Sequence, residues 1–183
     1  QPFALNLAQV RELERALTAV RGNGKRLIAY LENGSPLAIQ IAVLCDRVLM
    51  ADMAMLDCKG PSMNVMHFKD LLDLIGVQAD MTRVGEFKGA VEPFVLSEMS
   101  SALRDHYQAM LASINEDIVR RIAAGRRLDV AKVRDLQGRR LLRAEEALAA
   151  GLVDALVPWV GAERALRTEL GRDDIELVDA QPK

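Results

Sequence analysis

The chain has 183 residues, of which 50% are apolar and 27% are charged, so it can bury a hydrophobic core and is not a disordered chain. Lysine and arginine total 24 and aspartate and glutamate total 26, and this net charge of −2 argues against phosphate-backbone binding as the main function. Aromatic residues make up only 4%, which also disfavours a base-stacking surface for nucleic acid.

The first part of the chain alternates helices with short apolar strands. Apolar residues recur at helical spacing at the start, and two glycines then end that helix. Ser35 and Pro36 are typical of a helix start, because the serine can cap the helix and proline suits its first turn. The predicted elements are a helix over 7–20, a strand over 27–31, a buried helix over 35–45 and a strand over 47–50.

The second part continues this alternation. Its predicted elements are a helix over 67–75, a strand over 77–84, a loop or strand end over 85–93, a helix over 100–124, short helices over 130–136 and 144–150, a strand over 152–157, a polar helix after Gly161 and an extended stretch over 175–178. Strands separated by helices of this length indicate an α/β fold with mainly parallel pairing. We expect one domain over residues 1–160 and a carboxyl-terminal helix and tail over 161–183.

The sequence shows no membrane span, metal site or cofactor motif. Its longest uncharged run is too short to cross a bilayer, and its start lacks the basic and apolar regions of a signal peptide. Because it begins with Gln1 and not Met, we expect it to be a piece of a longer protein. Cys45 and Cys58 form no disulfide framework, and with His67 and His106 they show no metal-ligand spacing.

Lys88 is the candidate catalytic residue that the chemistry of the chain singles out. A predicted strand delivers it into a turn with glycine on both sides and apolar neighbours. A lysine in apolar surroundings loses proton affinity and can act as a general base that activates a serine. Glu86 and Glu92 oppose this effect unless they point away. On composition alone, a solvated loop lysine is the favoured interpretation.

The stretch RVGEFKGAVEPF, residues 83–94, closely resembles the lysine motif of the signal peptide peptidase A family, also called protease IV. The similarity extends over residues 5–157, although the lysine stretch is its specific part and the closing AGLVD is shared with the whole crotonase superfamily. The flanking segments that are similar to the family are residues 27–50, 55–60, 68–77, 96–104 and 144–154.

The resemblance implies a Ser–Lys dyad protease with a crotonase-like or Clp-protease-like core of stacked β-α-β units. Lys88 matches the general base of the family. The serine does not carry over, because Pro36 stands at the nucleophile position and the adjacent Ser35 is better explained as the helix cap. The oxyanion loop also departs from the family pattern, since Pro61 has no N–H to donate to an oxyanion.

These departures are similar to the amino-terminal half of the long family members, in which two related halves share one chain. That half gives the lysine and the other half gives the serine. The resemblance therefore implies that Lys88 serves a homologous serine-bearing domain or subunit, within an oligomer that cleaves signal-peptide remnants and other short apolar peptides. It also implies a bacterial protein on the extracytoplasmic face of the inner membrane.

Two further functions stay open at this point. The chain could be a non-catalytic scaffold half that lines a substrate groove, which the missing serine and Pro61 favour. It could also be a crotonase-type acyl-CoA enzyme, although no pair of oxyanion donors and no catalytic carboxylate can be placed for that chemistry.

Several other residues have a structural and a functional interpretation. Cys58 could form a dyad with Lys59, whose charge would lower the thiol pKa. His67 and His106 are interpreted as structural. The basic clusters are interpreted as solvated or interface charges in preference to an anion site. These clusters are Arg126-Arg127 and Arg139-Arg140 with Arg143.

Overall fold

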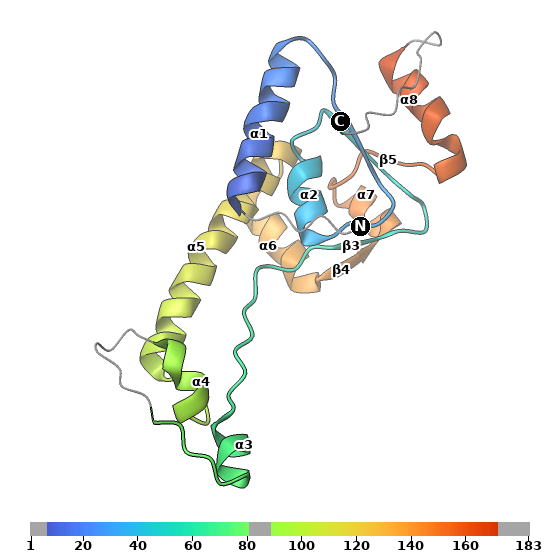
Figure 1. The fold of residues 1–183 in the computed structure, drawn as a ribbon. Coiled ribbons are helices and arrows are strands. Elements are labelled where there is room, and N and C mark those ends of the chain that lie inside the picture. The colour runs from blue at the N-terminus through green and yellow to red at the C-terminus, as the bar shows by residue number, and fades with distance from the viewer. Residues whose placement is uncertain (1–6, 81–88, 172–183) are drawn as a thin grey trace, which may run out of the picture. The chain divides into compact units, whose positions relative to one another are not determined.

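The computed structural model describes residues 7–80 and 89–171 (Figure 1). The chain divides into two compact units. Unit 1 consists of residues 1–59 and 118–183, and unit 2 consists of residues 60–117. The expected boundary at residue 160 between a domain and a tail stays a prediction.

Unit 1 contains a parallel three-stranded sheet in the order β1-β2-β5. Its strands are β1 (Ile28–Leu31), β2 (Arg47–Met50) and β5 (Ala155–Leu156). The helix α2 (Pro36–Ala42) connects β1 to β2, as parallel pairing requires. The α/β class with parallel pairing is therefore confirmed. The strand expected over 152–157 is shorter than predicted.

A second, antiparallel pair in unit 1 was not expected from the sequence. It joins β3 (Met55–Asp57) to β4 (Leu141–Arg143). Each strand has three residues and only the middle one, Leu56 or Leu142, is fully buried. Such a short segment carries no periodic signal in the sequence, so the pairing emerges only in the folded chain.

The longer helices follow one another in the order that the sequence predicts. They are α1 (Leu7–Gly22), α5 (Ser101–Arg126), α6 (Val130–Arg139), α7 (Ala144–Ala149) and α8 (Ala162–Leu170), with the short 3₁₀ helix η2 (Trp159–Gly161) before α8. The core of unit 1 joins β2 to α2, to the end of α5 and to α6 and α7. Val48, Leu49 and Met50 of β2 are at most 1% exposed. Burial of such side chains is the main force that stabilises the unit.

Unit 2 contains the short elements α3 (Lys69–Leu74), η1 (Gly89–Val91) and α4 (Glu92–Val95), and the first part of α5. The strand expected over 77–84 is wrong for residues 77–80, which are largely exposed and form no strand. The loop expected over 85–93 is instead helical from residue 89 onward. Residues 81–88 and 175–178 lie outside the described residues.

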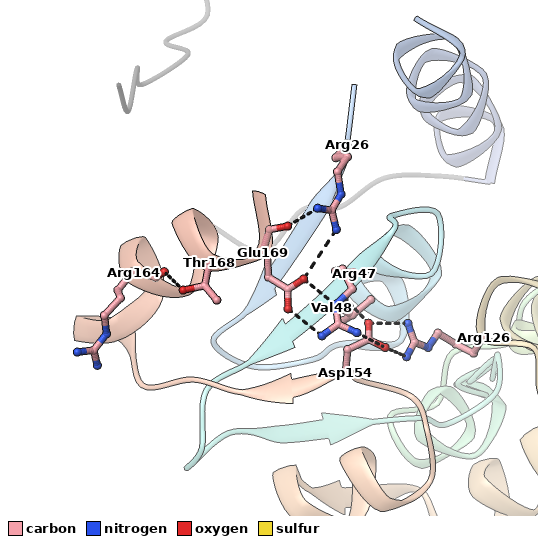
Figure 2. Close-up of polar contacts among 8 residues, drawn as sticks. All are labelled: Arg26, Arg47, Val48, Arg126, Asp154, Arg164, Thr168 and Glu169. Carbon is pink, nitrogen blue, oxygen red and sulfur yellow. Dashed lines mark hydrogen bonds and ion pairs between the residues drawn. The ribbon is translucent and has the colours of Figure 1, made fainter. Parts of the chain in front are cut away.

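A network of ion pairs in unit 1 links α8, β2 and the end of α5 (Figure 2). Arg47 binds both carboxylate oxygens of Glu169, with Nε–Oε2 at 3.0 Å and the second nitrogen–Oε1 contact at 2.8 Å. Arg126 binds both oxygens of Asp154 at 3.0 and 2.7 Å. The Val48 N–H also donates to Asp154, at 2.7 Å. Asp154 belongs to the AGLVD stretch, so this stretch has a structural role.

Candidate active site

The turn between β1 and α2 is the place where the family resemblance puts the nucleophile. Gly34 is essential to this turn, because an added Cβ would lie 2.0 Å from the Leu56 Cδ1 atom. The Gly34 N–H donates to the Met55 carbonyl at 2.9 Å, and the Gly34 carbonyl accepts from the Asp57 N–H at 2.7 Å. The turn is therefore held against β3.

Ser35 is exposed and caps α2. Its hydroxyl oxygen accepts a hydrogen bond from the Ala38 N–H at 3.1 Å, and Pro36 occupies the first turn. The side-chain cap satisfies a backbone donor that the helix itself leaves unpaired. The prediction that Ser35 is a helix cap is confirmed.

The loop after β3 offers few donors for an oxyanion. The Asp57 N–H donates to Gly34, and the Cys58 N–H donates to the Arg140 carbonyl at 2.7 Å. The Lys59 N–H donates to the Asp57 carboxylate at 3.0 Å. Three successive N–H groups are thus used within the fold, and Pro61 has none. An oxyanion hole needs preorganised N–H donors that point at the substrate and are not already hydrogen-bonded within the protein.

Cys58 is not an activated thiol. Its side chain is buried, and this burial, together with the nearby Asp57 charge, raises the thiol pKa to about 11. The Lys59 amino group does not counteract this shift, since it pairs with the Asp57 carboxylate at 2.8 Å. The expectation that Lys59 lowers the thiol pKa is wrong, because desolvation dominates at this position.

Lys88 lies outside the described residues, but the chain that follows it is described. Gly89 is buried against the Leu103 side chain, and an added Cβ would lie 2.4 Å from the Leu103 Cδ2 atom. Glu92 is 1% exposed and its carboxylate contacts Ser100, which precedes α5. The residue after the candidate base is therefore fixed from one side by the start of α5.

His67 and Phe68, which directly precede α3, also contact the segment after Lys88. The Phe68 N–H donates to the Pro93 carbonyl at 2.6 Å, and Phe68 stacks on Phe94 with ring centroids 5.8 Å apart. The His67 Nδ1 atom lies 2.8 Å from the Leu96 carbonyl oxygen. His67 thus has the structural role expected of it. Its Nε2 atom is buried without a hydrogen-bond partner among the described residues.

Three arginines of the basic clusters, Arg126, Arg139 and Arg143, are paired with carboxylates, and Arg126 is more buried than a solvated charge. Its side chain is 9% exposed and is paired with Asp154. Arg139 and Arg143 both contact Glu146. A cavity of about 500 Å³ lies at the end of α5 in unit 1, lined by Arg21, Arg47, Arg126 and Arg127. The first three of these arginines pair with Asp46, Glu169 and Asp154. These pairs neutralise most of the charge that an anion would need.

Neither a metal centre nor a membrane span is found in the described part of the chain. Residues 7–80 and 89–171 contain no group of three or more His, Cys, Asp or Glu side chains that could hold a metal ion. Within the same residues, each helix is too short or too polar to cross a bilayer.

The chain belongs to a peptidase family. Peptidase family S49 matches residues 19–171. The chain is 27% identical over 172 residues to Protease 4 of Salmonella typhi, covering 88% of this chain and 28% of the relative. It is 26% identical over 168 residues to Protease 4 of Haemophilus influenzae, covering 86% of this chain and 27% of the relative. The resemblance to the protease IV family is confirmed.

The chain spans little more than a quarter of the length of these two relatives. A crystal structure of a peptidase from Plasmodium falciparum is also similar, with a TM-score of 0.41 and 9% sequence identity, over 83% of this chain and 66% of that one. Membership of a peptidase family gives no support to the acyl-CoA alternative.

Glu92 is the residue near the candidate base whose importance the sequence did not reveal. From the sequence, Glu92 is only a nearby negative charge that would oppose a lowered pKa of Lys88. In the folded chain the Glu92 carboxylate is buried and accepts two hydrogen bonds from Ser100, eight positions later in the sequence. The only local signal was a charged residue directly before Pro93, and this pattern does not predict burial.

Proposed function

We propose that this chain is a serine endopeptidase domain that gives the general base, Lys88, to a Ser–Lys dyad. The serine comes from a homologous domain or subunit. The observation that carries this proposal is the state of the nucleophile turn: Ser35 is engaged as a helix cap, and the N–H groups of residues 57–59 are used within the fold. A domain that keeps the lysine motif without a free serine and free donors needs a partner to complete the site.

In the proposed reaction, the neutral Lys88 amine takes the hydroxyl proton of the partner serine as the serine oxygen bonds to the peptide carbonyl carbon. The protonated lysine then gives this proton to the departing amine, and the C–N bond breaks. A water molecule, deprotonated by the same lysine, then attacks the ester carbonyl carbon. The lysine returns this proton to the serine oxygen as the ester C–O bond breaks, which releases the peptide acid and restores the serine. Donors for the carbonyl oxyanion come from the serine-bearing domain.

The substrates and setting of the enzyme follow from the family. We propose that the assembly is an oligomer that cleaves signal-peptide remnants and other short apolar peptides in the bacterial cell envelope, on the extracytoplasmic face of the inner membrane. Nearly three quarters of the length of the two Protease 4 relatives is unmatched by this chain, which leaves room for the serine-bearing domain that the proposal requires.

The test is Lys88→Ala in the assembly that contains the serine-bearing domain, with a fluorogenic apolar peptide as substrate. We expect kcat to fall at least about 1000-fold, as removal of a catalytic base does in serine proteases. Lys132→Ala, which removes an exposed lysine of α6, is the matched control and is expected to leave kcat unchanged. Retained activity in Lys88→Ala would contradict the proposal.

A non-catalytic scaffold half is the second candidate, and the same geometry at Ser35 and residues 57–59 favours it. The two functions differ in their response to Lys88→Ala, because a scaffold half loses no catalytic group. Treatment of the isolated chain with a serine-reactive phosphonate tests for a self-sufficient enzyme. The lysine-donating domain and the scaffold half are both expected to remain unlabelled. Modification at Ser35 would contradict the split site.

A further inference from the structure

Glu92 is the only charged side chain that is fully buried among residues 7–80 and 89–171. Each of its carboxylate oxygens accepts a hydrogen bond from Ser100. The Ser100 N–H donates to Oε2 at 3.0 Å, and the Ser100 hydroxyl donates to Oε1 at 2.7 Å. A buried carboxylate is costly unless such bonds replace its hydration, so this position uses a charged group where a neutral one would be easier to bury.

Ser100 also forms a hydrogen bond with the first turn of α5. Its hydroxyl oxygen accepts a hydrogen bond from the Leu103 N–H at 3.3 Å, which caps the first turn of the helix. Because the hydroxyl proton is donated to Glu92, the oxygen lone pair is left to face Leu103. The Glu92 carboxylate therefore sets the orientation of the cap.

Leu103 in turn contacts the segment that follows the candidate base. Its side chain occupies the space where a Cβ of Gly89 would lie, with Cδ2 and Cδ1 at 2.4 and 2.6 Å from that position. Glu92, Ser100, Leu103 and Gly89 thus form a closed circuit of contacts within unit 2. Lys88 is the residue directly before this circuit.

We infer that Glu92 is a positioning residue for Lys88, because its buried carboxylate fixes the short segment between the lysine and the start of α5. The inference rests on the proposed role of Lys88 as the general base. Hydrogen bonds to an ionised carboxylate are shorter and stronger than those to a neutral amide, so they hold the segment more rigidly. A proton transfer needs its two heavy atoms within hydrogen-bond reach, and a misplacement of about 1 Å can cost about 100-fold in rate.

The decisive variant is Glu92→Gln, which keeps the shape and removes the charge. Its amide can accept from only one of the two Ser100 donors, so the cap loses its fixed orientation. Glu98→Gln is the matched control: it removes the same charge from an exposed position nearby, where no partner is found among the described residues. Ser100→Ala removes only the hydroxyl and provides a milder disturbance of the same contact.

Two readouts are compared, one at Lys88 itself and one on the cleavage reaction. The first is the pH dependence of reductive methylation at Lys88, followed by mass spectrometry in the chain. The second is the steady-state cleavage of the apolar peptide by the assembly. For Glu92→Gln we expect a kcat about 10- to 100-fold lower with KM within about twofold, and a methylation midpoint that moves by more than about half a pH unit. Glu98→Gln is expected to match the original chain in both.

The outcomes separate this inference from the proposed function. If Lys88→Ala abolishes cleavage while Glu92→Gln leaves the methylation midpoint and kcat unchanged, the inference is wrong and the proposed function stands. If Lys88→Ala remains active, the proposed function fails whatever Glu92 does. If Glu92→Gln does not fold, Ser100→Ala decides: an unchanged methylation midpoint and kcat would overturn the inference, and a kcat loss in the same direction supports it.

Discussion

Cys58 gives the sharpest test of the electrostatics near the nucleophile turn. Its thiol pKa of about 11 is raised by burial first and by the Asp57 charge second. At about pH 8, a free thiol with a pKa of about 8.5 is roughly one quarter thiolate, whereas a thiol with a pKa of about 11 is about one thousandth thiolate. Ionisation alone therefore lowers the reactive fraction by about 240-fold.

Part of this loss is offset, because a thiolate of higher pKa is the stronger nucleophile. With a Brønsted coefficient of about 0.4–0.5, a pKa difference of about 2.5 raises the intrinsic reactivity by about 10- to 18-fold. The remaining factor is about 13- to 24-fold, before any contribution from restricted access to the side chain. We therefore expect Cys58 to react at least about tenfold more slowly than a free thiol.

The assay follows the reaction of Cys58 with an aromatic disulfide reagent in a Cys45→Ser background, where Cys58 is the remaining cysteine. The same protein unfolded in guanidinium chloride provides the free-thiol rate. A native rate within about threefold of the unfolded rate would refute the reasoning from burial. Loss of peptide cleavage in Cys58→Ser would also refute it, since it would revive the Cys58–Lys59 dyad.

The remaining predictions concern the ion-pair network and the helix cap. Asp154→Ala removes the acceptor of the Val48 N–H and of both terminal Arg126 nitrogens, while the Arg126 Nε still donates to the Gly151 carbonyl. We therefore expect a loss of about 3 kcal/mol in the free energy of unfolding in urea, whereas the exposed Asp105→Ala should stay within about 0.5 kcal/mol; equal effects would contradict the role of the network. Burial opposes ionisation of Asp154, but the hydrogen bonds from Arg126 and Val48 and the nearby charges outweigh it and lower the pKa. A carboxyl with a lowered pKa stabilises the fold above its unfolded value of about 3.9 and loses this contribution as the pH falls through the folded value, so stability should drop below about pH 4, and less so in Asp154→Ala. Ser35→Ala should cost about 1 kcal/mol through the lost cap of α2 and leave kcat of the assembly unchanged; a large loss of kcat would make Ser35 a nucleophile.

The parts of the fold that sequence predicts well are those determined locally. Ser35 and Pro36 indicate the start of α2 because a side-chain cap and a first-turn proline act within one helical turn. The alternation of apolar strands with helices likewise predicts the parallel order of β1 and β2. Lys88 was found by its surrounding motif, and its catalytic role stays a prediction.

The parts that sequence does not predict depend on contacts between distant residues. The strands β3 and β4 pair Leu56 with Leu142, and neither strand is long enough to show a period. Residues 77–80 have the apolar and polar pattern of a strand but are largely exposed and form none. The hydrogen bond that the Ser100 hydroxyl donates to the Glu92 carboxylate closes a turn whose geometry no single residue specifies.

The N–H groups of residues 57–59 are hydrogen-bonded within the fold, and this affects how the concentration of active sites is measured. A boronate or phosphonate that mimics the tetrahedral intermediate needs both a serine and free oxyanion donors to bind tightly. In the proposed assembly this domain supplies neither. Active-site titration should therefore reach its end point at one equivalent of inhibitor for every two homologous domains, so a concentration based on total protein domains would overstate the number of working sites twofold.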